Sequence, residues 1–180
     1  MALTAQQLAK LSPRVWAGEG TATFALLDGA ASPTLLDQLY DAPGLEFECL
    51  YSGELEPDIA EVAPYIARVE AGSAFADWVL GLWGERRAIL VQVDVRVELP
   101  VLRRHFRKLN LVYGPDAAPL LLRYYDPRVL PLFLSTCDRA QVREMFGPVI
   151  RFVLEGASGG QGLALSAPAG ELVQEAFSVA

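Results

Sequence analysis

The sequence predicts an α/β or α+β protein in which helices flank a mixed β-sheet, with two lobes around a concave surface as one arrangement. Three observations predict this class. Stretches with the apolar patterns of strands alternate along the chain with stretches of helical spacing. Hydrophobic residues make up 52% and charged residues 21%, which excludes disorder as the main state. With 180 residues, the chain is long enough to bury a sizeable core.

We expect three segments along the chain: an N-terminal arm at residues 1–20, a main domain at residues 21–155, and a glycine-rich connector with a C-terminal tail at residues 156–180. The arm has a weak helical pattern that Pro13 interrupts. The connector has the composition of a flexible linker. The tail fits a short strand and a helix from Ala169.

Strand and helix signals follow one another through the first half of the main domain. The predicted strands are residues 21–28, 45–51, 61–69 and 88–97. Pro64 inside the third of them indicates an edge or a bulge. Ser32-Pro33 starts a helix that ends at Pro43-Gly44, because a serine cap followed by proline suits a first helical turn. Ser73 caps the clearest helix. Its apolar stripe consists of Phe75, Trp78, Val79, Leu82 and Trp83.

The second half begins with a basic helix at residues 98–109. Arg103, Arg104, Arg107 and Lys108 are predicted to face outward, opposite a narrow apolar stripe. A turn at residues 114–116 then indicates a hairpin. Two short helices follow, one from about Pro131 and one that Asp138 and Gln141 open as a capping box. Residues 149–154 form the last strand of the main domain.

The rest of the chain is organised around residues 120–149, which begin with an apolar run that leaves the core and turns sharply at residues 126–128. Asp126 suits a capping position, because its carboxylate can accept from free amides, and Pro127 fits the next position, where no donor is needed. Arg123 and Arg128 either belong to a local ion-pair and capping cluster or contact a partner. The structural role is favoured for Arg123 and Asp126, whereas for Arg128 the two interpretations are nearly even.

Charge is divided unevenly along this chain, whose net charge is −7. Residues 1–98 carry 15 acidic and 6 basic side chains, whereas residues 99–151 carry 4 acidic and 9 basic ones. Such asymmetry can orient a partner, and the acidic half disfavours nucleic acid. No apolar run approaches the roughly 20 residues of a membrane span, and the N-terminus does not resemble a secretory signal. We therefore expect a cytoplasmic protein without a nucleic-acid or membrane partner.

The sequence contains no recognisable catalytic constellation. His105, the single histidine, lies within the basic helix, and Cys49 and Cys137 are expected to be free thiols among apolar neighbours. One histidine and two cysteines at these separations do not make a metal site. The glycine-rich stretch lacks the Lys-Ser/Thr ending of a phosphate-binding loop. We therefore predict neither catalytic residues nor a cofactor.

Residues 123–128 are an arginine, two tyrosines and Asp-Pro-Arg, followed by a short helix, a capped helix and Phe-Gly-Pro. This pattern resembles the adaptor proteins of bacterial type VI secretion, which are effector chaperones long catalogued as a domain of unknown function. Residues 24–30, 50–53 and 62–66 are similar to further segments of that family, the last with Val-Ala where a glycine is more usual. Together the similar segments cover most of residues 21–154.

The resemblance implies a non-catalytic adaptor that binds a cognate secretion effector through an apolar or helical segment. It also implies that the protein helps to load this effector onto the VgrG spike, which is a further candidate partner. Asp126 and Pro127 are expected to be structural. The candidate partner contacts are Arg103, Arg104, Arg107, Arg123, Tyr124 and Arg128. The alternative is a small carboxylate-dependent hydrolase or transferase, which needs a clustered acid pair whose pKa values are pushed apart.

Overall fold

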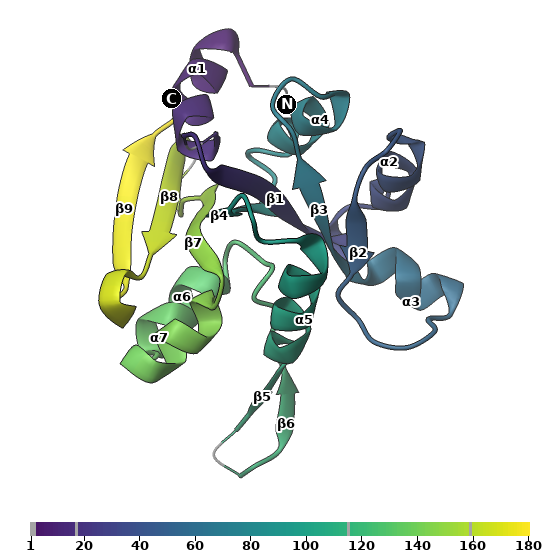
Figure 1. The fold of residues 1–180 in the computed structure, drawn as a ribbon, viewed down its shortest axis with the longest axis vertical. Helices are drawn as coiled ribbons and strands as arrows, with labels where there is room; N and C mark the ends of the chain where they lie inside the picture. Colours follow the sequence, from purple (N-terminus) through teal and green to yellow (C-terminus); the bar gives the residue numbers. More distant parts are fainter. Residues whose placement is uncertain (1–2, 17, 115, 159) are drawn as a thin grey trace.

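A seven-stranded β-sheet forms the centre of the fold in the computed structural model, which describes residues 3–16, 18–114, 116–158 and 160–180. Its strands stand in the order β2-β3-β1-β4-β7-β8-β9, and every neighbouring pair is antiparallel (Figure 1). Their bounds are β1 (Thr21–Asp28), β2 (Phe47–Cys49), β3 (Pro64–Val69), β4 (Ala88–Asp94), β7 (Val149–Glu155), β8 (Gln161–Ser166) and β9 (Val173–Ser178). With helices on both faces, this is the predicted α+β class, built on an antiparallel sheet.

Two hydrophobic clusters lie on opposite faces of the sheet. Successive side chains of a strand point to opposite faces, so Phe24 and Leu26 of β1 enter one cluster, and Ala25 and Leu27 enter the other. Helices α5 (Leu99–Leu109), α6 (Leu130–Thr136) and α7 (Arg139–Phe146) cover the first cluster. Helices α1 (Ala5–Val15), α2 (Leu35–Asp41) and α4 (Ala74–Gly81) cover the second. The continuous apolar run of β1 thus follows from burial on both sides.

Local capping signals explain where three of these helices begin. The Ser73 hydroxyl accepts from the Ala76 amide, as predicted for α4. Asp138 and Gln141 form the predicted capping box of α7. Thr4 and Gln7 form a second capping box at α1, which the sequence analysis did not predict. Part of the predicted arm is thus helix α1, which continues through Pro13, and its Leu11 and Val15 are fully buried.

A second, two-stranded sheet stands apart from the central one. It consists of β5 (Leu111–Tyr113) and β6 (Pro119–Leu121), which pair as the predicted hairpin. In Figure 1 the hairpin extends from the end of α5, away from the seven-stranded sheet. At its base, the buried Asn110 donates from its side-chain amide to the Leu50 carbonyl over 2.7 Å. The hairpin is thus anchored at one end.

Several predicted elements differ from the structure. Residues 57–62 form helix α3 (Pro57–Val62) before β3, so the predicted strand over residues 61–69 begins too early. Pro64 is the first residue of β3, where a missing amide donor is tolerated, and β3 lies inside the sheet rather than at its edge. The predicted strands 45–51 and 88–97 are also shorter in the structure, as β2 and β4.

The C-terminal part of the chain shows the largest difference. Residues 156–162, predicted to be a flexible connector, include the turn from β7 into β8, where the Gly156 amide donates to the Gln161 carbonyl over 2.9 Å. The predicted helix from Ala169 is wrong, because a short 3₁₀ turn (Pro168–Gly170) leads into β9. The division into arm, domain and tail stays a prediction, although β8 and β9 belong to the same sheet as β1.

Candidate partner-binding surface

The corner at Asp126 is held by ion pairs between residues that are close in sequence. Asp126 is only 3% exposed and accepts from the Arg128 guanidinium, with nitrogen–oxygen distances of 2.7 and 2.9 Å. It also accepts from the Arg128 backbone amide at 2.8 Å. Burial alone would raise the pKa of Asp126, but the hydrogen bonds from Arg128 outweigh burial and lower it. The predicted structural role of Asp126 therefore has a defined geometry, and Pro127 lies between the two partners.

Arg123 joins the corner to the end of β1. Its guanidinium donates to the Asp28 carboxylate at 2.5 Å, and Asp28 is buried whereas the Arg123 side chain is 42% exposed. The guanidinium also lies 5.8 Å from the centre of the Tyr125 ring, within cation–π range. A buried carboxylate needs such a partner, because an unpaired charge is costly to bury. Arg123 therefore has a structural task, as the sequence analysis favoured.

Two of the predicted outward arginines of α5 instead hold β2 and the loop after it. Arg103 lies 3.2 Å from the Glu48 carboxylate. The Arg107 guanidinium donates to the Tyr51 carbonyl. Both arginine side chains are half-buried. The prediction that they face outward is therefore wrong in part, because residues at this spacing share one side of the helix and that side faces β2.

Tyr124 is a correction to the predicted partner contacts. It is 1% exposed, its ring stacks on Phe106 with a centroid separation of 5.6 Å, and its hydroxyl donates to the Phe106 carbonyl at 2.9 Å. Burial raises the pKa of Tyr124 well above its ordinary value. Its side chain belongs to the core and is not available at the surface.

One stripe of α5 is exposed. It contains Arg104 and Lys108, which are separated by one helical turn, together with Val101 at 43% exposure. Neither basic side chain has a hydrogen-bond or ion-pair partner within the part of the chain that the structure describes. Of the six predicted contact residues, Arg104 is thus the exposed one whose charge forms no ion pair among the described residues.

The β5–β6 hairpin exposes large apolar side chains that the sequence analysis did not select. These are Leu111 (55% exposed), Tyr113 (73%), Leu120 (52%) and Leu121 (55%). Isolated two-stranded sheets are marginally stable in water, and contiguous apolar surface of this kind is typical of interaction sites. The sequence pattern that could have indicated this surface is the apolar residues on both strands of a hairpin that is too short to form a core sheet. Leu111, Tyr113 and Leu121, which share one face of the hairpin, form the candidate surface together with Arg104 and Lys108.

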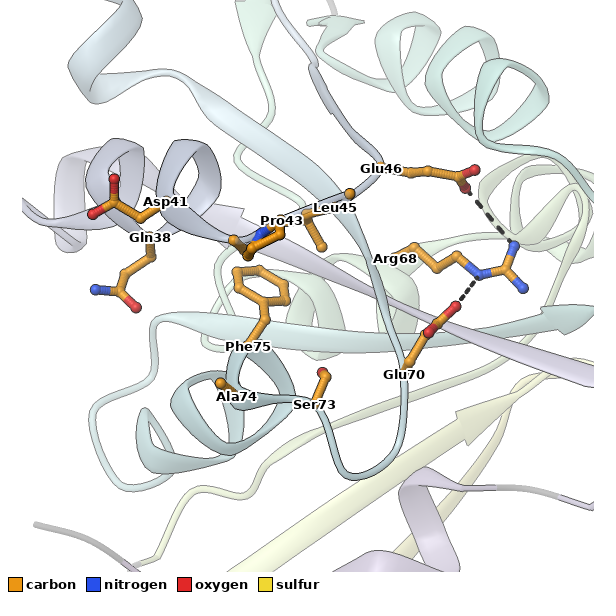
Figure 2. Close-up of a pocket in the computed structure, with 12 residues that line it drawn as sticks. Gln38, Asp41, Pro43, Leu45, Glu46, Arg68, Glu70, Ser73, Ala74 and Phe75 are labelled. Carbon is orange, nitrogen blue, oxygen red and sulfur yellow. Dashed lines mark ion pairs between the residues drawn. The ribbon is translucent and has the colours of Figure 1, made fainter.

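A cavity of about 390 Å³ lies between the loop after α2 and the start of α4, on the opposite side of the sheet from α5. Figure 2 shows Phe75 beneath Pro43, and Arg68 between two carboxylates. Arg68 pairs with Glu46 at 3.8 Å and with Glu70 at 3.5 Å. These ion pairs do not favour acid–base chemistry, and neither histidine nor cysteine is among the described residues that line the cavity.

Two further carboxylates with shifted pKa values lie far from each other. Burial raises the pKa of Glu155, and hydrogen bonds from Arg96 lower that of Asp94. These carboxylates lie at opposite ends of the adjacent strands β4 and β7. His105 is half-buried, with Nε2 3.1 Å from the Met145 carbonyl oxygen, and burial lowers its pKa.

The two thiols and the other carboxylates give no further site. Cys49 and Cys137 are free and half-buried, so the predicted free thiols are confirmed. Within the described ranges there is no group of three or more histidine, cysteine, aspartate or glutamate side chains placed to hold a metal ion. No helix in those ranges has the length and apolar character needed to cross a membrane.

Comparison with known proteins identifies a family. A family model described as "Domain of unknown function (DUF4123)" matches residues 23–144, which is more than half of the chain. No curated protein and no solved structure matches. The matched range runs from β1 into α7 and contains both the corner and the hairpin.

Proposed function

This chain belongs to the DUF4123 family, and on that premise we propose that it is a non-catalytic cytoplasmic adaptor that binds a cognate type VI secretion effector. In this proposal it also helps to load the effector onto the VgrG spike. The proposal starts from the resemblance of the Asp-Pro-Arg corner and the segments around it to adaptors of that system, and all of those segments overlap the matched range.

The observation that carries the proposal is the exposed apolar surface of the β5–β6 hairpin beside basic residues of α5. Interfaces commonly combine apolar anchors with a polar rim, and aromatic residues such as Tyr113 are enriched among the anchors. Tyr113 is 73% exposed, and Lys108 lies within one helical turn of the start of β5. This arrangement supports a binding protein better than an enzyme, because its exposed groups offer contact area and charge rather than a nucleophile and a base.

Affinity purification from the native cells tests the proposal. The tagged full-length chain should recover a stable one-to-one complex with a large toxin encoded next to it. A chain that elutes alone and turns over a small molecule would contradict the proposal and favour the carboxylate-dependent alternative. The double variant Arg104→Glu/Lys108→Glu should recover less of the toxin, because both charges are exposed and unpaired within the described residues.

A matched control keeps the net charge of that double variant. Arg14→Glu/Arg96→Glu makes the same change away from α5, where Arg14 and Arg96 pair with Glu175 and Asp94. Recovery of the toxin should not change in this control. Equal losses in both double variants would show that the toxin responds to net charge and not to this surface.

A further inference from the structure

The β5–β6 hairpin is a sheet with two open edges. Its ladder pairs Leu111 with Leu121, Val112 with Leu120, and Tyr113 with Pro119, and no third strand joins it among the described residues. Val112 packs against the core, so one face of the hairpin is turned partly toward the body of the protein. The opposite face carries Leu111, Tyr113 and Leu121, which are all more than half exposed.

The hydrogen-bond pattern shows which backbone groups point away from the hairpin. The Leu122 amide donates to the Asn110 carbonyl over 2.9 Å, and the Gly114 amide donates to the Ala118 carbonyl over 3.0 Å. Bonded and non-bonded pairs alternate in an antiparallel ladder, so Val112 is turned toward β6. The amides and carbonyls of Leu111 and Tyr113 are therefore directed away from β6, along the outer edge of β5.

The two edges differ in what they can offer to another strand. On β5, Leu111 and Tyr113 each present an amide donor and a carbonyl acceptor. On β6, the corresponding outward positions are Leu121 and Pro119, and proline has no amide hydrogen. A proline at such a position is a common way to prevent further pairing at a sheet edge. The β5 edge is therefore open to strand addition, whereas the β6 edge is partly blocked.

Charge near this edge indicates what kind of strand fits. Lys108 lies in the last turn of α5, next to the start of β5, and Arg104 lies one helical turn before it in the middle of the helix. Both side chains are exposed. At the far end of the hairpin, the Asp116 carboxylate accepts from the Ala118 amide over 3.2 Å and is thereby held in the turn. A strand on the β5 edge thus meets unpaired positive charge at the α5 end.

We propose that the β5 edge accepts an extended segment of a partner protein as a third strand, with apolar side chains beside Leu111 and Tyr113 and acidic residues at the end near α5. Main-chain hydrogen bonds supply affinity in such strand addition, and side-chain contacts supply specificity. This inference deepens the proposed function, since it names how the partner is held. A second copy of the chain is the alternative occupant, and it would reveal itself by self-association through β5 (Leu111–Tyr113) in the absence of a peptide.

Peptide selection on the intact protein tests this inference without a known partner. The probe is a displayed library of random peptides of about twelve residues, selected on the full-length chain and then synthesised. Selected peptides should alternate apolar residues and carry acidic residues at one end. In wild-type protein, the bound peptide should slow hydrogen exchange of the Leu111 and Tyr113 amides at least tenfold and leave the Leu121 amide unchanged.

Matched proline variants identify the edge. Tyr113→Pro removes an outward donor from β5, and Leu121→Pro removes one from β6, and neither donor bonds within the ladder. Tyr113→Pro should lower peptide affinity at least tenfold, and Leu121→Pro less than threefold. Lys108→Glu should lower affinity for the acidic peptides about fivefold, and this effect should weaken in high salt.

Several results would overturn the inference. These are the absence of any enriched peptide, equal affinity for wild type and Tyr113→Pro, binding without protection of the two amides, and self-association of the free chain that protects the same amides. If Tyr113→Pro misfolds, the hydrogen-exchange measurement on wild type tests the inference by itself, through protection of the Leu111 and Tyr113 amides. If Tyr113→Pro stays folded and recovers the neighbouring toxin as well as wild type does, strand addition fails while the adaptor function stands. If wild type recovers no toxin but selected peptides bind the β5 edge, the adaptor function is contradicted and strand addition stands.

Discussion

The Asp126 corner and the β5–β6 hairpin are neighbours in the sequence, yet their side chains are engaged in opposite ways. At the corner, the charges of Arg123 and Arg128 are paired with the buried Asp28 and Asp126. On the hairpin, Leu111, Tyr113 and Leu121 are more than half exposed, and no third strand pairs with β5 or β6 among the described residues. The charges of the motif that carries the family resemblance are thus paired within the protein, whereas under our proposal the hairpin provides the contact surface.

The largest expected effect is on the scaffold side of this comparison. Arg123→Ala leaves the Asp28 carboxylate buried without its cation, so we expect the free energy of unfolding to fall by about 2–3 kcal/mol. Arg104→Ala removes an exposed arginine and should change it by less than about 0.5 kcal/mol. Urea unfolding at pH 7 measures both. Similar values for the two variants would mean that Arg123 belongs to the contact surface.

A smaller loss is expected when the pair of Arg128 and Asp126 is broken. Arg128→Ala should lower stability at pH 7 by about 1–2 kcal/mol, because charge-assisted hydrogen bonds to a buried carboxylate are lost. The lowered pKa of Asp126 stabilises the fold above the unfolded pKa of about 3.9, and this contribution disappears as pH falls through the folded pKa. Between pH 5 and pH 2 the free energy of unfolding should therefore fall less in the variant than in wild type. The difference between the two falls should be about 1–2 kcal/mol, the contribution of the pair at pH 7.

This outcome bears on the near-even interpretation of Arg128. If Arg128→Ala unfolds at a clearly lower temperature than wild type, the residue belongs to the scaffold. If its melting temperature is unchanged while partner capture falls, Arg128 is a contact instead. The bidentate geometry at 2.7 and 2.9 Å leads us to expect the first result.

His105 belongs to neither region and should give a modest, pH-dependent effect. Burial lowers its folded pKa, so the unfolded chain binds more protons as pH falls below about 6.5. Wild type should therefore lose stability between pH 7 and pH 5.5, by less than about 1 kcal/mol. His105→Gln should remove this pH dependence. An unchanged slope in the variant would place the titrating group elsewhere.

The smallest effect on stability is expected at the hairpin. Leu121→Ser exchanges an exposed apolar side chain for a polar one and should change the free energy of unfolding by less than about 0.5 kcal/mol. Leu122→Ser, one residue further on, is the matched control, because Leu122 is buried in the core and its loss should cost about 2–3 kcal/mol. Equal destabilisation by both changes would mean that the hairpin is packed rather than exposed.

The fold was most predictable where hydrogen bonds are local. The caps at Ser73 and Asp138 depend on residues three positions away, and the sequence identified both. The C-terminal strands depend on distant residues: a short strand was expected in the tail, but β9 was predicted as a helix. A Cβ at Gly162 would lie 2.1 Å from the Phe177 ring, so this glycine is needed for close packing of β8 and β9, although its surroundings have the composition of a linker.

The candidate site was predicted in part for the same reason. Arg104 was correctly predicted to be exposed, but Arg103 and Arg107 face β2, whose position beside α5 depends on the tertiary fold. Tyr124 was misplaced, because a tyrosine suits both an interface and a core, and the structure buries it together with the neighbouring Tyr125. The apolar residues of the hairpin escaped notice because their pattern is also that of a buried strand.

The strand order gives the hairpin a further property. The strands β4 and β7 are direct neighbours in the sheet, and the chain leaves the sheet after β4 and returns at β7. Residues 111–121 therefore lie within one connection between two adjacent strands, and those strands fix both of its ends. Under our proposal this segment can be exchanged between family members as a cassette, so that recognition is transplanted while the sheet that supports it is left intact.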